Sequence, residues 1–504
     1  MLSKIRTAVL QGIEGQPVLL ETDISYGLPS VTIVGLADAS VKEARERIRP
    51  ALVNSGFRFP SHRITMNISP ADVHKHGSHL DLPMAVGILL SGGDLECPEA
   101  DGCAYFGELS LDGQLRPVRG ILPMVRAVKA SGVGKVIVPV ENAGEAALIE
   151  GIDVYGVHNL QQLVRFLCRS EPIMPCIRGK CQEQVSKPLK DYRDVRGQEA
   201  AKRALTVAVA GGHGILMTGS PATGKTMLAE RIPGILPPMS MEEKLRLTEI
   251  YSIAGMLDQD NPFVNRRPFR HPHSSTSRAG LIGGGQEPWP GEVTLAHHGV
   301  LFLDEMPEFP SSALESLRIP LEEKEVRLNR NGRTYHFPAD FLLAAAANPC
   351  PCGYYGDSGH ECRCSESEVR RYQKRISGPL LSRIDIQIHL PSLTYEQVTG
   401  EGVLDSETMR RQVISAREIQ KSRFQGTSIQ LNSQMDRRQI QKWAALDHAS
   451  ELILEDAYNK LNMDPRMLDK TVRTARTIAD LEGSSEIRME HLTEALAYRR
   501  KNTI

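Results

Sequence analysis

The 504-residue sequence lacks several features that would each indicate a class of protein. It has no excess of one charge, since 60 Lys and Arg residues face 61 Asp and Glu residues, so net charge gives no argument for a nucleic-acid partner. It has no apolar run of about 18 residues, and its start, MLSKIRTAVLQGIEG, contains no signal-peptide core. Its nine cysteines, an odd and scattered set, do not resemble a secreted disulfide framework. These absences favour a cytoplasmic protein that does not enter a membrane.

What is present is the composition of a globular α/β protein, with 41% hydrophobic and 24% charged residues. At about 150 residues per domain the length predicts about three domains. We expect strands at residues 31–34 and 64–68 and a helix at 39–54, and later a parallel sheet flanked by helices. The predicted segments are an α/β domain at 1–167, a Pro- and Gly-containing linker at 168–190, a second α/β domain at 191–393 and a helical domain at 394–504.

The segment GSPATGKT at 219–226 fits the pattern of a phosphate-binding loop, G-x-x-x-x-G-K-[ST]. An apolar run at 215–217 precedes it and the helical MLAERI follows, which disfavours a chance glycine-rich turn. We expect Lys225 to neutralise β- and γ-phosphate charge and Thr226 to bind Mg²⁺. The glycines let backbone N–H groups face the phosphates. The predicted nucleotide contacts are Gly219, Ser220, Pro221, Ala222, Thr223, Gly224, Lys225 and Thr226.

A second motif, VLFLDE at 300–305, is a continuous apolar strand that ends in two carboxylates. Ligands of open α/β sheets bind at the carboxyl ends of the strands. Asp304 is therefore expected to hold Mg²⁺ together with Thr226, and Glu305 to orient or deprotonate the attacking water. Taken alone, the motif is equally well explained as an ordinary strand end; the phosphate loop makes the functional interpretation the stronger one.

A third strand, at 341–347, ends in Asn348, whose amide can both donate and accept hydrogen bonds near a γ-phosphate. The segment SGPLLSRIDIQIHLP follows, and its Arg383 is a candidate arginine finger for the nucleotide of a neighbouring subunit. The alternative for Arg383 is a surface arginine in a salt bridge.

Four cysteines, Cys350, Cys352, Cys362 and Cys364, form the pattern C-x-C-x₉-C-x-C. Four thiolates within 15 residues suggest a tetrahedral structural zinc site. Free or redox-active thiols are the alternative.

The segment EVRLNRNGRTYHF at 325–337 predicts a β-hairpin, because Asn-Gly is the preferred pair of a type I′ turn. Arg327, Arg330 and Arg333 crowd its tip, although exposed arginines on an ordinary solvated hairpin are common. In the helicase-like members of the AAA+ class, which this sequence resembles in the motifs set out below, a hairpin at this point would bring such arginines to DNA phosphates.

The loop GLIGGGQEPWPG at 280–291 is a second candidate for contact with DNA. Its glycines permit movement, and Trp289 is suited either to stacking on a base or to packing within the protein.

The order of phosphate loop, VLFLDE, strand with Asn348, and LLSRID is similar to that of AAA+ ATPases. The stretch FRHPHSSTSRAGLIGGGQEPWPGEVTLAHHGVLFLDEMPEF, with AAANPCPCGYYGD and ARTIADL, resembles more specifically the YifB/ComM group of magnesium-chelatase-like ATPases. The resemblance runs from the first residues to the last. It implies a Lon-protease-type N-terminal domain, an AAA+ core with a parallel sheet, and a helical lid. ATP and Mg²⁺ are the implied cofactors, and a homohexamer is the implied assembly.

The resemblance also implies roles for residues outside the main motifs. Val195 and Gly197, in RDVRGQ, would line the adenine pocket, and Arg466, in DPR, would contact the γ-phosphate from the lid. Ser220 and Ala222 stand where the family more often has proline and glycine, and the two residues before Arg466 also depart from its pattern. Reduced turnover, not loss of binding, is the expected consequence.

In the N-terminal domain, SPADVHKHGSHLDLPMA and FGELSLDGQLRPVRG are similar to Lon-type proteases. Proteolysis would need a serine nucleophile and a lysine base. His79 and Met124 occupy the corresponding positions, with Ser78 one residue away, so we expect a non-proteolytic module.

The resemblance points to an ATP hydrolase that acts as a DNA translocase or branch-migration helicase on single-stranded or branched DNA, in homologous recombination during natural transformation. The basic hairpin is the local feature in its favour. The alternative from another class is a chelatase-like ATPase that remodels a protein partner. An ATP-dependent protease is the third hypothesis, and for it peptide cleavage would be required.

Overall fold

The computed structural model divides into two compact units, Met1–Gln184 with Ser240–Asn265, and Val185–Met239 with Arg266–Ile504. The predicted linker falls largely on residues 178–189, which lie outside the described part of the chain. The structure describes residues 2–36, 38–93, 97, 100, 102–177, 190–258, 261–330, 332–357, 359–400, 404–461 and 463–499.

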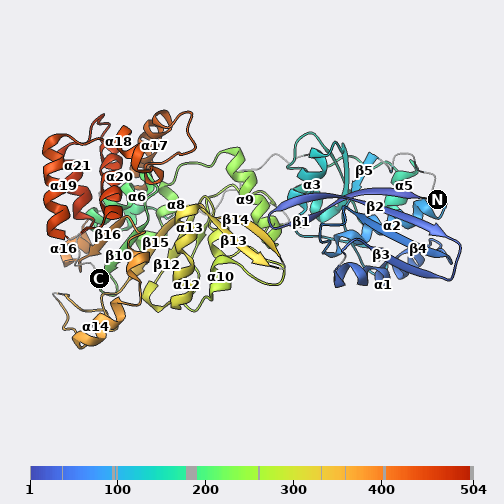
Figure 1. Cartoon of the computed structure of the whole chain (residues 1–504), viewed down its shortest axis with the longest axis horizontal. Helices are drawn as coiled ribbons and strands as arrows, with labels where there is room; N and C mark the ends of the chain where they lie inside the picture. Colours follow the sequence, from blue (N-terminus) through green and yellow to red (C-terminus); the bar gives the residue numbers. More distant parts are fainter. Residues whose placement is uncertain are drawn as a thin grey trace. The chain divides into compact units, whose positions relative to one another are not determined.

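The first unit is built on a seven-stranded mixed sheet with the order β3-β4-β2-β1-β5-β8-β9 (Figure 1). The β1–β2 ladder is antiparallel and β4 continues it, whereas β3 and the strands from β5 onward pair in parallel. The predicted strands at 31–34 and 64–68 are confirmed as parts of β3 and β4. The strands are β1 (Ser3–Gln11), β2 (Glu14–Ser25), β3 (Ser30–Val34), β4 (Arg63–Ser69), β5 (Cys103–Tyr105), β8 (Lys135–Pro139) and β9 (Asp153–Val157).

Helices cover this sheet, and the predicted helix at 39–54 is confirmed as α1. The Asp38 side chain begins it by accepting a hydrogen bond from the Val41 N–H at 2.8 Å, a typical N-cap. Arg47 on α1 donates to both oxygens of the buried Asp81 at 2.8 and 3.0 Å, which joins α1 to α2. The helices are α1 (Ala39–Asn54), α2 (Asp81–Ser91), α3 (Ile121–Ala130), α4 (Val140–Ala146) and α5 (Leu160–Leu167).

The segment Ser240–Asn265, which lies within the range predicted for the second α/β domain, belongs to the first unit. Its helix α9 (Met241–Ala254) starts with a capping box. The Ser252 hydroxyl donates to the buried carboxylate of Glu145, and Arg126 pairs with the buried Glu249 at 2.9 Å. The chain therefore leaves the second unit after the phosphate loop, packs a helix onto the first unit and returns.

The second unit contains a five-stranded, fully parallel sheet with the order β11-β12-β15-β10-β16. The central strands β10, β12 and β15 are buried along their whole length, as expected for a sheet covered on both faces. The apolar runs at 215–217, 300–303 and 341–347 are confirmed as strands. The strands are β10 (Ile215–Gly219), β11 (Phe269–Arg270), β12 (Val300–Leu303), β15 (Leu342–Ala347) and β16 (Ile386–Leu390), with β13 (Glu325–Arg330) and β14 (Arg333–Pro338) as a separate hairpin.

Helices flank this sheet, and those after residue 394 gather into a helical region, orange to red in Figure 1. On α17, Arg417 and Gln420 donate to main-chain carbonyls of α6 at 2.7 and 3.1 Å. No helix of the described residues has both the length and the apolar character needed to cross a membrane. The helices used below are α6 (Glu199–Gly211), α7 (Lys225–Ala229), α10 (Arg278–Ile282), α12 (Ser311–Ser316), α13 (Arg318–Glu323), α14 (Glu366–Gln373), α16 (Tyr395–Thr399), α17 (Ser406–Arg423), α18 (Arg437–Trp443), α19 (His448–Leu461), α20 (Pro465–Leu481) and α21 (Met489–Ala497).

Candidate nucleotide-binding site

The phosphate loop at 219–226 joins strand β10, an interior strand of the sheet, to helix α7, as predicted. Gly224 has φ +91° and starts α7, so the turn uses the conformational freedom of glycine. Ala222 also has a positive φ, +64°, where an L-residue is strained by about 1 kcal/mol or more. The exposed Ala222 thus takes a backbone conformation that glycine would take without strain.

Lys225 and Thr226 begin α7 beneath this loop. The Lys225 ammonium donates to the carbonyls of Gly219 and Ser220 at 2.7 and 2.8 Å. Burial lowers the pKa of Lys225, against the attraction of Asp304. The Thr226 hydroxyl donates to an oxygen of Asp304 at 2.7 Å, so the two predicted Mg²⁺ ligands from separate motifs meet.

Glu305 and Asn348, the two other side chains predicted for this site, follow strands that end at the same edge of the sheet. Asp304 and Glu305 follow β12, and Asn348 follows β15, which pairs with both β10 and β12. The main-chain N–H of Glu305 donates to Asp304 at 3.0 Å, and Glu305 itself has φ +49°. A hydroxyl, a lysine, two carboxylates and an amide therefore converge where the parallel strands end, which is where α/β sheets bind ligands.

The segment with Val195 and Gly197 reaches the phosphate loop through Gln198. The Gln198 amide donates to the carbonyl of Thr223 at 3.3 Å and to that of Pro391, after β16, at 2.9 Å. Gly197 has φ +64°, and Val195 is almost fully buried. The predicted adenine-pocket segment is thus anchored beside the predicted phosphate site.

Arg383 and Arg466 lie at the opposite edge of the sheet, where the strands begin. Arg383 pairs with Glu322 at 2.9 Å, and its side chain is only 10% exposed. Both arginines line one cavity of about 420 Å³, together with Lys470 and Arg473. The five residues of β16 lie between Arg383 and the phosphate-loop edge of the sheet. From the first to the last of these residues the strand spans about 13 Å. The two arginines are therefore grouped with each other and away from Lys225.

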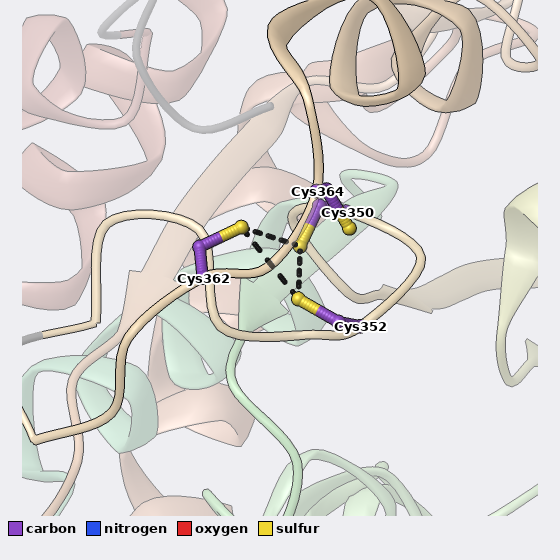
Figure 2. A group of neighbouring side chains, drawn as sticks. All are labelled: Cys350, Cys352, Cys362 and Cys364. Carbon is purple, nitrogen blue, oxygen red and sulfur yellow. Dashed lines mark hydrogen bonds between the residues drawn. The ribbon is translucent and has the colours of Figure 1, made fainter.

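The four predicted cysteines also meet (Figure 2). The sulfur of Cys350 lies 3.3 Å from that of Cys352 and 3.7 Å from that of Cys362, and all four sulfurs lie within 4.8 Å of one another. Tetrahedral zinc with bonds of about 2.3 Å places sulfurs about 3.8 Å apart. Main-chain N–H groups, led by that of Tyr354, lower the pKa of Cys352 to about 6. Sulfur-only donors at this spacing fit a zinc-class ion.

Asp357, within the same cysteine segment, contacts the phosphate loop and was not singled out by the sequence. Its carboxylate accepts hydrogen bonds from the hydroxyls of Ser220 and of Ser392, the latter at 2.8 Å. Ser220 and Asp357 are 137 residues apart, so local spacing holds no signal for this contact.

The predicted hairpin is confirmed as β13–β14, with Arg330 opposite Arg333. Gly332 has φ +72°, as the two-residue turn requires, and Asn331 lies outside the described residues. Arg327 is exposed but forms ion pairs with two neighbouring glutamates, at 3.1 and 3.3 Å.

The hairpin and the loop at 280–291 contact each other. The Arg330 guanidinium donates to the Gly285 carbonyl at 3.3 Å. Trp289 pairs through its main chain with Gly284 and is 41% exposed. The two segments proposed separately from the sequence therefore form one surface.

The Lon-like positions of the first unit carry no serine–lysine pair. The Ser78 hydroxyl donates to Glu108, and the buried His79 ring contacts the Ala8 carbonyl at 3.0 Å. Burial lowers the pKa of His79 to about 4, and Met124 lies in the core. The partner of Ser78 is therefore a carboxylate and not the lysine of a serine–lysine pair.

The sheet order and the phosphate loop after the interior strand β10 define a P-loop nucleotide-binding domain of the AAA+ type. Three family models match this chain. The model described as magnesium chelatase, subunit ChlI, matches residues 191–398, and the one described as subunit ChlI of Mg-chelatase matches residues 20–142. The model of the ChlI C-terminal region matches residues 404–499. The uncharacterized protein YifB of Salmonella typhimurium is 40% identical over 505 residues, covering 99% of this chain and 97% of that protein. Competence protein ComM of Haemophilus influenzae is 39% identical over 505 residues, with the same coverage.

The chain therefore belongs to the YifB/ComM family of magnesium-chelatase-like AAA+ proteins. A shorter match, 35% identity over 111 residues, joins 20% of this chain to Lon protease 2 of Bacillus subtilis.

Proposed function

We propose that this chain is a Mg²⁺-dependent ATP hydrolase that works as a homohexameric ring with the nucleotide between adjacent copies. The meeting of Lys225, Thr226 and Asp304 carries the proposal. Thr226 and Asp304 would hold Mg²⁺, which neutralises charge on the β- and γ-phosphate oxygens when bound. Glu305 would orient the attacking water, and Asn348 would contact the γ-phosphate or that water.

The ring part of the proposal is supported by Arg383 and Arg466. Both lie at the sheet edge opposite to Lys225, and both line one cavity of about 420 Å³. A cation placed there can stabilise the transition state only at a nucleotide held by another copy of the chain. We therefore assign both arginines to the neighbour's γ-phosphate, with Arg383 as the finger.

The substrate proposed for the motor is single-stranded or branched DNA, handled in recombination during natural transformation. The supporting observation is that the hairpin and the loop at 280–291 form one surface bearing Trp289, Arg330 and Arg333. Arginines contact phosphates and an exposed indole stacks on bases. One relative carries the name competence protein, which agrees with the proposed role in natural transformation.

The test is steady-state ATPase activity with no DNA, single-stranded DNA or a branched junction, each at two salt concentrations. We expect DNA to stimulate turnover several-fold and salt to weaken the stimulation, because phosphate contacts release counterions. The double variant Arg330→Ala, Arg333→Ala should lose the stimulation. Arg45→Ala, at an exposed arginine of the first unit, should keep it.

A protein-remodelling ATPase is the second candidate. The register places Arg327 opposite His336, three residues before Arg330, and not at the tip as the sequence predicted. Its two glutamate partners favour the alternative, because they reduce the positive charge at the base of the hairpin. ATP hydrolysis that is indifferent to every DNA would reject the DNA motor and support this alternative. Absence of hydrolysis under all conditions would reject both.

We also propose that Cys350, Cys352, Cys362 and Cys364 hold a structural zinc ion. Elemental analysis of protein purified without chelator should give close to one zinc per chain. A content below about 0.2 per chain would reject a site of ordinary affinity.

A further inference from the structure

The cysteine segment is attached to the nucleotide site at more than one point. Asp357 is the first attachment: its side chain is 3% exposed and accepts from the hydroxyls of Ser220, in the phosphate loop, and Ser392, just after β16. Its other oxygen accepts from the main-chain N–H groups of Gly359 and His360 at 2.8 and 3.0 Å. One carboxylate therefore ties the cysteine segment to the ends of β10 and β16.

Gly353 is the second attachment. It has φ +89°, and a Cβ atom there would lie 2.7 Å from ring carbons of Pro221 in the phosphate loop. The backbone of the cysteine segment therefore rests directly against the phosphate loop. This contact leaves no room for a Cβ atom at Gly353. A small displacement of the segment would therefore either break the contact or displace Pro221.

The third attachment is covalent. Asn348, the predicted γ-phosphate contact, is followed by Pro349 and then by the fully buried Cys350. On the far side, the Gln373 amide of α14 donates to the Pro349 carbonyl at 3.3 Å. The first candidate metal ligand is thus two residues from Asn348.

The described residues between Cys350 and Cys364 form turns and bends, with no helix or strand among them. Turn hydrogen bonds, such as that from the Gly353 N–H to the Cys350 carbonyl at 3.0 Å, take the place of a ladder here. An ion that joined the four sulfurs would add cross-links that these turns do not supply. An ion bound there would fix Asp357 and Gly353 in place. Loss of the ion would free both contacts with the phosphate loop.

We propose that the cysteine segment is a metal-dependent brace of the nucleotide site, in which an ion on the four cysteines holds Asp357 against Ser220 and so keeps the phosphate loop in its ATP-binding conformation. The inference rests on the ATP binding and the zinc site proposed above. Asp357 is a positioning residue, because it acts through Ser220. The brace predicts that the metal controls affinity for nucleotide as well as stability of the fold.

The test measures equilibrium binding of a fluorescent ATP analogue with Mg²⁺ to the full chain, alongside its zinc content. Asp357→Asn and Ser220→Ala should each weaken binding about fivefold to tenfold, the size of one partly lost hydrogen bond to a charged group. The double variant should be no weaker than either single one, since both remove the same contact. Zinc content should stay at the wild-type level in all three.

Removal of the ion should reproduce this loss of affinity for the ATP analogue. Cys362→Ser, or wild type stripped with a chelator, should bind the analogue at least fivefold more weakly. Adding Asp357→Asn to Cys362→Ser should cause little further loss. Asp112→Asn is the matched control: Asp112 accepts from a serine hydroxyl and a main-chain N–H in a turn of the first unit, and its replacement should leave the affinity unchanged.

The outcomes separate the proposals. Wild-type protein that does not bind the analogue would contradict the ATP-binding function itself. Wild-type affinity in both Asp357→Asn and zinc-stripped protein would overturn the brace while ATP binding stands. If circular dichroism shows that Cys362→Ser does not fold, Ser220→Ala provides the test, because it removes only a hydroxyl group. Unchanged affinity for the ATP analogue in folded Ser220→Ala would reject the brace.

Discussion

The two edges of the parallel sheet in the second unit differ in how completely their charged groups are paired. At the edge where the strands end, Lys225 donates to two carbonyls and Thr226 meets Asp304, so the polar groups are paired within the chain. At the edge where the strands begin, Arg383 pairs with Glu322 at 2.9 Å, but the Nε atoms of Arg383 and Arg473 are buried and have no hydrogen-bond partner among the described residues. Both of these arginines line the same cavity.

Buried donors without partners are rare in folded proteins, and each calls for an explanation. A phosphate supplied by a second copy of the chain would satisfy the arginines at the starting edge. This difference is the one expected from the proposal that one edge holds the chain's own nucleotide and the other completes the site of a neighbour.

The largest effect should come from breaking the starting edge at Arg383. Arg383→Ala should lower ATP turnover by about 10³-fold or more, as expected for loss of an arginine finger, and leave binding of ATP nearly unchanged. Steady-state ATPase and equilibrium binding of a fluorescent ATP analogue measure the two quantities. Lys225→Ala, at the other edge, should lose both.

Mixing the two inactive variants distinguishes action within a chain from action between chains. An interface with Lys225 from the Arg383→Ala chain and Arg383 from the Lys225→Ala chain is complete, so a mixture should exceed the activity of either variant alone. A mixture as inactive as its components would show that Arg383 serves its own chain or only the fold.

The comparison also shows which parts of the molecule the sequence could predict. The phosphate loop, the strand before Asp304 and the hairpin at Gly332 depend on residues adjacent in the chain, and their periodicity and turn chemistry predicted them correctly. The meeting of Thr226 with Asp304 followed from the rule that parallel strands end at one edge.

Long-range contacts were not predictable in this way. Ser220 and Asp357 are separated by 137 residues, and neither residue has a local pattern that signals the other. Helix α9 has an ordinary capping box, so nothing in its own sequence indicates that it packs on the first unit. The cavity shared by Arg383 and Arg466 likewise depends on how the helical region after residue 394 packs against the sheet.

A smaller effect, on stability, should come from Asp385 at the starting edge. Burial opposes its ionisation, yet Lys470 at 2.6 Å and His213 at 2.9 Å hold the pKa of Asp385 well below its usual range. Asp385→Asn would leave buried cations without their counter-charge, so we expect the free energy of unfolding in urea to fall by about 3–5 kcal/mol at pH 7.

The pH dependence gives a second check on Asp385. Because its folded-state pKa is depressed, its stabilising effect is present above the unfolded-state pKa of about 4 and is lost as the pH falls below that value. In Asp385→Asn, the free energy of unfolding should therefore fall less steeply as the pH is lowered below about 4 than it does in the wild type. Asp456→Asn, which breaks an exposed ion pair with Lys460 on α19, should change stability by less than about 1 kcal/mol, and an equal loss in both variants would contradict the role of burial.

The smallest expected effect concerns the strained residue at the ending edge. Ala222 is exposed and has φ +64°, so its methyl group buries little surface while its backbone is strained. Ala222→Gly removes the strain but adds freedom to the unfolded chain, so the net gain in stability should be between 0 and about 1 kcal/mol. The matched change Ala200→Gly, at an exposed position in the first turn of α6, should instead be destabilising by up to about 1 kcal/mol. Thermal unfolding of both variants measures the difference. A destabilised Ala222→Gly would mean that the strain released at this position is smaller than the effect of the freedom that glycine adds to the unfolded chain.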